Sequence, residues 1–319
     1  MNKSILLIIL NIFIYSCRNI KYNETHLNAE TVIDQLSDSS FLSDVRSIQF
    51  DKYLYITDYG RDQLLILDLD GRIIKSLGTK GKGPGEFLGA SHLFVVNDSI
   101  FVYNDGKRSF EIFNIDEHLI TVRLPGDIEL SSSFRFFYKG GKLFFSSVFD
   151  SNGIVSFDIN SYDTKRFGKI KQFETPKQTQ IRNNKHLFLD NNYLIAVSDN
   201  LPIIERYDFN GNLLEIFDYS NHPITKRRIN TIHDLQKDPN GYSLLLQDAF
   251  YFENKLYLLL YSNSESKISC NDILIIANVN ANMLIQGTYH LSQLWYQSVC
   301  VSDGFLYAFG MAGLEIFRI

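Results

Sequence analysis

The stretch that decides the fold is Tyr53–Phe87, YLYITDYGRDQLLILDLDGRIIKSLGTKGKGPGEF. It contains three apolar runs, separated by polar turns that are rich in Asp and Gly. This pattern is typical of antiparallel β-strands joined by tight turns. The last ten residues, Gly78–Phe87, carry four glycines and two lysines, which raises the question of a phosphate-binding loop.

Gly78–Phe87 matches neither nucleotide-binding motif. A P-loop requires G-x-x-x-x-G-K-[ST] followed directly by a helix, but here Gly83 precedes Pro84. The dinucleotide pattern G-x-G-x-x-G fails because its third glycine would be Glu86. Since Gly and Pro are above all turn residues, we interpret this stretch as a connection between two structural units.

The strand pattern of Tyr53–Phe87 recurs along the chain. Six stretches combine a short alternating strand, a polar turn and a second apolar strand, and they begin at Ser47, Leu93, Arg135, Leu187, Phe250 and Val299. In the first five, a third strand ends at a turn where Asp or Asn recurs in register, at Asp68, Asn114, Asp158, Asp208 and Asn278. Four antiparallel strands repeated in this way indicate propeller blades. We therefore predict an all-β fold, a six-bladed β-propeller of four-stranded antiparallel blades.

The sixth repeat is one strand short, because the chain ends at Ile319 after its third strand. A blade left in this state would expose an unpaired edge. We predict that a strand from the N-terminal segment Tyr22–Leu36 pairs there and closes the last blade.

One connection between repeats is longer than the others. It includes Asn221–Gly241, where Ile229, Ile232 and Leu235 fall at helical spacing, so we predict a short helix over one face of the ring. The basic run Lys226–Arg228 is interpreted as the solvated side of this helix, with a binding patch as the alternative.

The first seventeen residues have the pattern of an export signal. Lys3 supplies a positive charge, and Ile5–Tyr15 is an apolar run too short to span a bilayer as a helix. The run Ile14–Cys17, IYSC, resembles the bacterial lipobox. This resemblance implies cleavage before Cys17 and lipidation of its thiol. An ordinary secretory signal or a buried strand is the alternative.

These patterns divide the chain into three parts. We predict a lipoprotein signal peptide at 1–17 with lipidated Cys17, a short tether at 18–21 and the propeller at 22–319. Several acyl chains on one cysteine bury enough CH₂ groups for stable membrane anchoring. Without an acidic run after Cys17, we expect an anchor in the outer membrane that faces the periplasm.

Tyr53–Phe87 resembles an NHL repeat. From about Phe41 to Ile319 the chain resembles the bacterial six-bladed β-propeller lipoproteins of the NHL-repeat/TolB-like kind, which are common in Bacteroidota. The resemblance is specific in the first repeat and in the G-x-G-P-G-E-F connection, whereas later repeats share only the strand pattern. It implies the propeller fold but no particular molecular function.

Composition and motifs limit the classes of function. The net charge of -5 gives no basic footprint for a nucleic-acid backbone, so we expect no nucleic-acid partner. Zinc-protease and serine-hydrolase motifs do not occur in the sequence. Polar positions on the expected inner strands are sparse, and they are Gln49, Arg135, Asp190 and Glu253. We therefore nominate no catalytic residue, metal ligand or cofactor; Ca²⁺ is conceivable, but no motif supports it.

We predict a lipid-anchored binding or interaction module of the cell envelope, which recognises a polymer, a glycan or a protein partner with one propeller face. A metal-dependent hydrolase or lyase of the calcium type, acting at the channel mouth, is the alternative. The candidate ligand face combines the blade connection with loops between second and third strands, at Arg61, Asp62, Lys80, Lys82, Lys107, Arg108, Asp150, Asn152, Asp199 and Asn200. Pairing of Cys270 with Cys300 and the oligomeric state stay open, and we favour Cys300 as a small buried hydrophobe.

Overall fold

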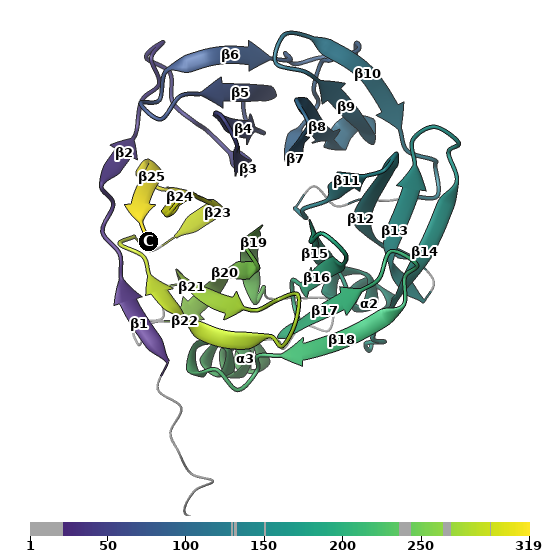
Figure 1. Ribbon diagram of the computed structural model, residues 1–319, viewed down its shortest axis with the longest axis vertical. Helices are drawn as coiled ribbons and strands as arrows, with labels where there is room; N and C mark the ends of the chain where they lie inside the picture. The colour runs from purple at the N-terminus through teal and green to yellow at the C-terminus, as the bar shows by residue number, and fades with distance from the viewer. Residues whose placement is uncertain are drawn as a thin grey trace, which may run out of the picture.

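The computed structural model is a six-bladed β-propeller, with six sheets arranged around a common axis (Figure 1). It describes residues 22–319 except positions 129, 131–132, 150, 236–243, 264–268 and 294. The predicted fold class is confirmed. Cys17 and the rest of the predicted signal peptide and tether, 1–21, lie outside the described residues.

Each blade is an antiparallel meander whose first strand lies nearest the axis of the ring and whose fourth strand lies at the rim. Blade 1 consists of β3 (Val45–Phe50), β4 (Leu54–Asp58), β5 (Gln63–Leu67) and β6 (Ile73–Leu77). Blade 2 consists of β7 (Ala90–Val96), β8 (Ser99–Asn104), β9 (Ser109–Phe113) and β10 (His118–Arg123). Blade 3 consists of β11 (Phe137–Lys139), β12 (Lys142–Phe149), β13 (Asn152–Asp158) and β14 (Thr164–Lys169). Blade 4 consists of β15 (Lys185–Leu189), β16 (Leu194–Ser198), β17 (Ile203–Tyr207) and β18 (Leu213–Asp218). Blade 5 consists of β19 (Leu246–Phe252), β20 (Lys255–Asn263), β21 (Ser269–Ala277) and β22 (Leu284–His290). Blade 6 contains β23 (Tyr296–Ser302), β24 (Phe305–Gly310) and β25 (Gly313–Arg318).

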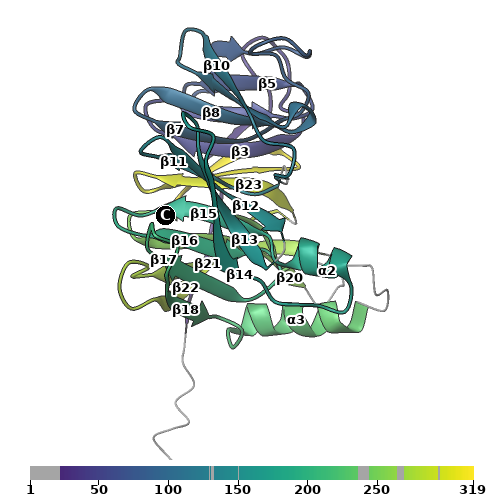
Figure 2. The same ribbon diagram turned by 90° about the vertical axis from the view of Figure 1, so that its right-hand side faces the viewer.

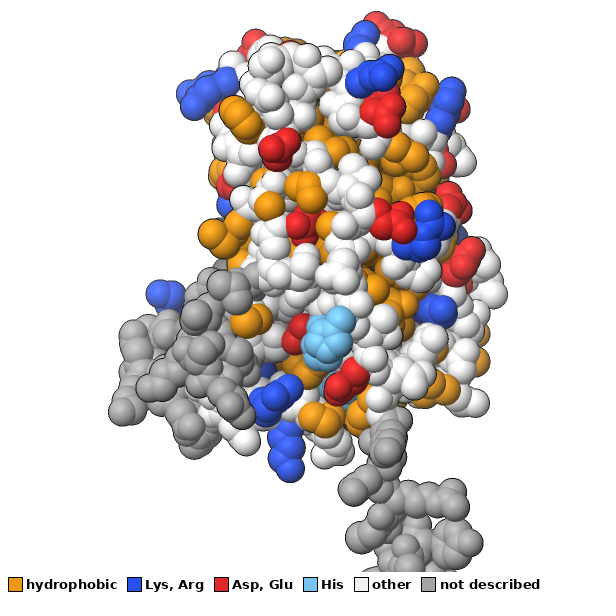
Figure 3. Space-filling view, turned by 90° about the vertical axis from the view of Figure 1, so that its left-hand side faces the viewer, with side chains coloured by type: hydrophobic (Ala, Val, Ile, Leu, Met, Phe, Trp, Pro, Cys, Tyr) orange, Lys and Arg blue, Asp and Glu red, His pale blue; other side chains and the backbone are white. Residues whose placement is uncertain are grey.

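The N-terminal segment closes the ring, as predicted. β2 (Thr31–Ile33) pairs antiparallel with β25 and supplies the fourth strand of blade 6. A second addition was not predicted: β1 (Asn23–His26) pairs in parallel with β22 as a fifth strand of blade 5. Gly287 permits this approach, because a Cβ there would lie 2.5 Å from the carbonyl oxygen of Asn23. Figure 3 views this side of the ring, where hydrophobic and charged side chains are interspersed.

The recurring Asp and Asn residues at the turns between third and fourth strands act as turn formers. Asp68 Oδ1 accepts hydrogen bonds from the backbone N–H of Asp70 and of Arg72, at 3.0 and 2.9 Å. Asn114 and Asp158 accept from backbone N–H groups two and three residues further on in the same manner. Such side-chain-to-backbone bonds satisfy the turn without any ligand.

Gly78–Phe87 connects β6 of blade 1 to β7 of blade 2, as expected for a blade connection. Gly78 and Gly85 adopt φ of +78° and +72°, a left-handed conformation that favours glycine. Phe87 is fully buried, with its ring centroid 5.7 Å from that of Phe113. Glu86 faces back into its own loop, where its carboxylate accepts the N–H of Gly83 at 2.6 Å.

Two helices project from the same end of the ring (Figure 2). α3 (Pro223–Leu235) lies in the segment predicted to be helical, whereas α2 (Pro176–Arg182) was not predicted. Within the basic run, Lys226 and Arg227 are exposed, but Arg228 is buried and donates to the carbonyl of Leu244. No helix in the described part of the chain is long and apolar enough to cross a membrane.

The two ends of the ring differ in what they carry. We call the end with the blade connections, α2, α3 and the loops between second and third strands the connection face. The opposite end, with the turns between first and second strands, is the turn face. Between them, the blades pack through apolar side chains; Cys300 is part of this core, and it is fully buried and not disulfide-bonded. Burial raises its pKa to about 12, which keeps the thiol protonated.

Candidate functional site

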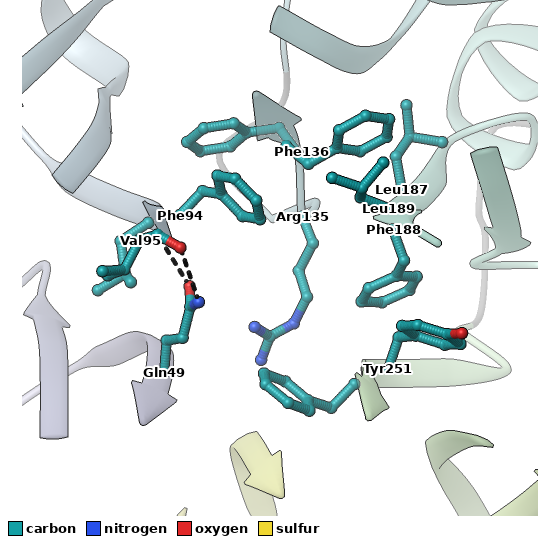
Figure 4. A pocket seen from close by; sticks show the side chains of 12 residues that line it. Gln49, Phe94, Val95, Arg135, Phe136, Leu187, Phe188, Leu189 and Tyr251 are labelled. Atoms are coloured by element: carbon teal, nitrogen blue, oxygen red, sulfur yellow. Dashed lines mark hydrogen bonds between the residues drawn. The ribbon is translucent and has the colours of Figure 1, made fainter. Parts of the chain in front are cut away.

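The channel contains a cavity of about 230 Å³, which we call the channel cavity (Figure 4). Five of the six blades contribute to its walls, through Gln49, Leu93–Val95, Arg135–Phe137, Leu187–Leu189 and Phe250–Tyr251. Most of these side chains are aromatic or aliphatic, because the inner strands are short alternating runs of such residues. The result is a largely apolar hollow with few polar groups.

Gln49 is one of the polar groups, and it is already satisfied. Its side-chain amide accepts from the N–H of Val95 at 2.9 Å and donates to the carbonyl of the same residue at 3.2 Å. Figure 4 shows this pair of bonds between blades 1 and 2. The side-chain amide of Gln49 therefore pairs with the backbone of β7 as a neighbouring strand would, and it joins the inner strands of blades 1 and 2.

Arg135 is the charged group of the channel cavity. It is 5% exposed and forms a side-on ion pair with Asp248, which is 1% exposed. Nε donates to Oδ1 at 2.8 Å and Nη2 donates to Oδ2 at 2.6 Å. Nη2 also donates to the carbonyl of Val299 at 2.7 Å. The guanidinium thus links blades 3, 5 and 6 across the channel.

Asp248 is held in its charged form by this environment. Burial alone would raise its pKa, but the charge and hydrogen bonds of Arg135 outweigh burial, so its pKa lies below the ordinary value. Its Oδ2 also accepts from the Ser298 hydroxyl at 3.0 Å and from the Val299 N–H at 2.9 Å. Arg135 and Asp248 are therefore both charged, and their opposite charges cancel.

One guanidinium nitrogen remains available. Arg135 uses Nε and Nη2 in these bonds, and its Nη1 makes no hydrogen bond within the described part of the chain. Because Arg135 lines the channel cavity, Nη1 is a hydrogen-bond donor for a molecule that enters.

Two buried histidines lie beside the ion pair. Burial lowers the pKa of His92 to about 3 and that of His186 to about 4, so both rings are neutral at pH 7. Their ring centroids are 6.3 Å apart, and Nδ1 of His186 accepts from the N–H of Arg135 at 3.4 Å. Neither ring is among the residues that line the channel cavity.

The described residues of the predicted ligand face lie on the connection face, but several of them are engaged within the protein. Arg61 donates to the Ser40 hydroxyl at 2.7 Å and to the carbonyl of Phe41 at 3.3 Å. Asp62 is 8% exposed and accepts the N–H of Gly89 at 2.5 Å. Lys80 is highly exposed, with its amino group 3.9 Å from the Asp62 carboxylate.

Lys82 is also exposed, whereas Lys107 is not. Lys107 forms an ion pair of 2.6 Å with the fully buried Glu111 and donates to the carbonyls of Gly83 and Glu86 at 2.9 and 3.1 Å. It therefore holds the connection Gly78–Phe87 against blade 2 instead of presenting its charge to a ligand.

The remaining candidates are also mostly internal. Arg108 donates to the carbonyls of residues 126 and 128, at 3.1 and 2.5 Å. Asp199 and Asn200 are buried, and the Asn200 amide donates to Oδ2 of the Asp199 carboxyl group at 2.8 Å. Asn152 begins β13, and Asp150 lies outside the described residues.

The channel cavity and the predicted ligand face are at different ends of the channel. Gln49, Val95 and Leu189 lie at or one residue before the ends of β3, β7 and β15, next to the turn face. The sequence had marked Gln49 and Arg135 as polar residues on apolar inner strands, and this was the available signal. Asp248, His92 and His186 were missed.

In the described part of the chain, no group of three or more His, Cys, Asp or Glu side chains could hold a metal ion.

The comparison with known proteins supports the fold. The model of a family described as 6-bladed beta-propeller, DUF5128, matches residues 35–272. No curated protein matches the chain in sequence.

Several solved structures share the architecture. A member of the DUF4221 family from Bacteroides vulgatus is 13% identical, with a TM-score of 0.63 over 93% of this chain and 98% of that chain. A Bacteroides fragilis protein that carries the name of an exported protein is 17% identical, with a TM-score of 0.58 over 89% and 87%. A virginiamycin B lyase from Staphylococcus aureus is 11% identical, with a TM-score of 0.52 over 92% and 88%.

At these identities the likeness shows the fold alone. The family model, in contrast, covers more than half of the sequence. This chain therefore belongs to the 6-bladed beta-propeller family.

Proposed function

We propose that this protein is a lipid-anchored binding module of the bacterial cell envelope, and that its channel cavity binds a small uncharged ligand with one hydrogen-bond acceptor. The observation that carries this proposal is the Nη1 donor of Arg135 in an otherwise largely apolar hollow. Sites for small molecules commonly combine apolar walls with a few placed polar groups.

The volume sets the size of the ligand. An apolar cavity of about 150 Å³ accommodates benzene. The channel cavity measures about 230 Å³, which suits a single substituted ring. A polymer does not fit there except through a terminal group.

The charge balance selects an uncharged acceptor. The charge of Arg135 is already matched by Asp248, and His92 and His186 are neutral because burial lowers the pKa of each ring. A bound anion would add an unbalanced charge to a buried site, which is costly. A carbonyl, amide or hydroxyl oxygen can accept from Nη1 without that penalty.

The cellular location rests on the N-terminal sequence. The run Ile14–Cys17 supports a lipid anchor, and the name of the similar Bacteroides fragilis protein supports export. We propose a propeller of the NHL-repeat/TolB-like kind, anchored in the outer membrane and facing the periplasm. A glycan, polymer or protein partner would be recognised on the connection face.

We propose binding and not the alternative hydrolase or lyase activity. Asp248 is engaged by Arg135, and the two histidine rings lie outside the lining. Tyr251 does line the channel cavity, but burial raises the pKa of its phenol, which keeps it protonated at neutral pH. A general acid or base must reach its substrate within hydrogen-bond distance.

The test compares two probes of the same shape, benzamide and benzoate, with the full chain in detergent micelles. Ligand-observed NMR and calorimetry should show binding of benzamide and weaker or no binding of benzoate. Leu189→Trp fills the channel cavity and should abolish binding. Leu213→Trp, at a position 48% exposed on the rim strand of the same blade, is the matched control.

Preferential binding of benzoate would contradict the charge argument. Equal binding of benzamide to Leu189→Trp and to the unchanged chain would show that the probe binds elsewhere. Absence of binding by benzamide, acetanilide and phenol alike would argue against the channel cavity as a ligand site.

A further inference from the structure

A second hollow lies on the connection face, where blade 6 meets blade 1. It has a volume of about 580 Å³, and we call it the seam pocket. Its walls come from the segment between β2 and β3, from the start of β23 and from the β24–β25 turn. The residues used in the argument are Asp34, Phe41, Asp44, Trp295, Gln297 and Met311.

The apolar part of the seam pocket is unusually exposed. Phe41 is 62% exposed and Met311 is 77% exposed, and Trp295, the one tryptophan of the sequence, is partly buried beside them. Scattered apolar side chains on a surface are ordinary, but several that line one concave site indicate a binding region.

The polar part of the seam pocket is arranged around Asp44. One carboxylate oxygen accepts from the side-chain amide of Gln297, and the other accepts from Arg46 Nη2 at 2.9 Å. The charge of Asp44 is therefore matched by Arg46. Within the described part of the chain, Gln297 Oε1 and the exposed carboxylate of Asp34 accept no hydrogen bond from another side chain, which leaves them as acceptors for a ligand.

The wall that carries Phe41 is held in place from below. The carboxylate of the fully buried Asp58 accepts the N–H groups of Ser43 and Asp44 at 2.8 and 3.1 Å. Arg61 donates to the hydroxyl of Ser40 and to the carbonyl of Phe41. These bonds fix the wall before any ligand arrives, which reduces the entropy lost on binding.

We propose that the seam pocket binds a saccharide. A sugar ring has an apolar C–H face and a polar edge of hydroxyl groups, and the seam pocket pairs aromatic side chains with amide and carboxylate acceptors in the same way. A volume of about 580 Å³ lies within the range of sites for drug-sized ligands and has room for a short oligosaccharide.

Charge argues against a cationic ligand at the same site. Asp44, the carboxylate next to the aromatic wall, is already paired with Arg46, and Arg61 adds a second cation behind Phe41. Among the described residues that line the seam pocket, Asp34 alone offers an unmatched negative charge. A neutral polyol uses the available acceptors without requiring a net negative site.

This inference rests on the proposed recognition of a glycan on the connection face, but not on the channel cavity, because the two sites share no lining residue. The sequence allows a direct measurement, since Trp295 is the one tryptophan and lies in the seam pocket. The full chain is titrated in a detergent without a sugar head group. The probes are maltotriose, cellotriose, xylotriose and the trisaccharide of N-acetylglucosamine. Binding is measured by tryptophan emission and by calorimetry.

At least one trisaccharide should shift the emission of Trp295 to shorter wavelength in a saturable manner. Phe41→Ala should weaken binding about tenfold, because one stacking surface is lost. Asp34→Asn should weaken binding and leave the melting temperature unchanged. Phe149→Ala and Asp116→Asn replace exposed residues elsewhere and should bind as the unchanged chain does.

Three results would overturn the proposal. They are no response by emission or heat to any of the four trisaccharides, a response to tetramethylammonium in place of the sugars, and variants at Phe41 and Asp34 that bind as tightly as their controls. Leu189→Phe narrows the channel cavity and should leave saccharide binding intact, so failure of one site is distinguishable from failure of the other.

Discussion

Arg135 and Asp248 meet across the channel through two parallel hydrogen bonds of 2.8 and 2.6 Å, although 113 residues separate them in the sequence. Arg135 lies two residues before the first strand of blade 3, and Asp248 lies in the first strand of blade 5. The pair therefore ties together blades that are not neighbours in the ring, and Arg135, the member that lines the channel cavity, is held in place by it.

Asp248→Ala should lower the free energy of unfolding by about 3–5 kcal/mol, because it leaves the guanidinium of Arg135 buried without its counter-ion. The double variant Arg135→Met with Asp248→Leu should recover most of this loss. Urea denaturation measures both. Glu30→Ala, which breaks the exposed pair with Arg318, should leave the midpoint unchanged. An equally small effect for Asp248→Ala would contradict the prediction.

The protein should lose stability as the pH falls below about 6.5. Burial lowers the pKa of His92 to about 3 and those of His186 and His222 to about 4, whereas these rings titrate near 6.5 when unfolded. Between these values the unfolded chain binds more protons, so each ring contributes a slope of about 1.4 kcal/mol per pH unit. Urea denaturation at pH 7, 6 and 5 measures the combined slope of the free energy of unfolding with pH. His186→Asn should lower that slope by the contribution of one ring. A flat profile would show that the rings are accessible to protons.

Asp199 should act in the opposite direction. Burial raises its pKa to about 8, so the folded protein keeps a proton that the unfolded chain releases above pH 4. Its contribution to stability is therefore present at low pH and is lost as the pH rises towards 8. Relative to the unchanged chain, Asp199→Asn should raise the free energy of unfolding more at pH 8 than at pH 5. Asp116→Asn, an exposed control, should leave the free energy of unfolding unchanged at both pH values. Equal effects of Asp199→Asn at both pH values would disprove the raised pKa.

Lys107→Met should loosen the connection Gly78–Phe87. It removes the ion pair with the buried Glu111 and two bonds to loop carbonyls, and we expect a loss of about 3 kcal/mol. The amides of Gly81 and Phe87, which bond within the loop, should exchange hydrogen faster. Lys82→Met removes an exposed lysine from the same loop and should leave exchange unchanged. Unchanged exchange in Lys107→Met would show that the loop holds itself.

Ile33→Ala should weaken the closure of the ring. Ile33 is 6% exposed on β2 and packs into the core between blades 6 and 1, so its truncation should cost about 2–4 kcal/mol. Val32→Ala, on the opposite side of the same strand and 46% exposed, should cost less than about 1 kcal/mol. Thermal unfolding of the two variants provides the comparison, and equal losses would mean that β2 is not a core strand.

Part of the channel cavity was visible in the sequence. Gln49 and Arg135 stand out as polar residues on apolar inner strands, and such residues need partners once they are buried. The partner of Arg135 was not visible, because Asp248 precedes the stretch recognised as the fifth repeat and nothing local links the two. The described loop positions of the predicted ligand face lie together on the connection face, as the strand order implies, and their role in binding stays a prediction. Their internal bonds, such as that of Lys107 to Glu111, depend on tertiary contacts.

The sequence by itself determined the number of blades, the strand order within each blade, the turn residues and the closure by an N-terminal strand. These features follow from local periodicity and from the need to pair every strand edge, and both can be read along the chain. Only the tertiary structure decided where a ligand fits. The channel cavity and the seam pocket are each assembled from distant segments, and their volume, charge balance and free donors or acceptors arise when the ring closes and brings those segments together.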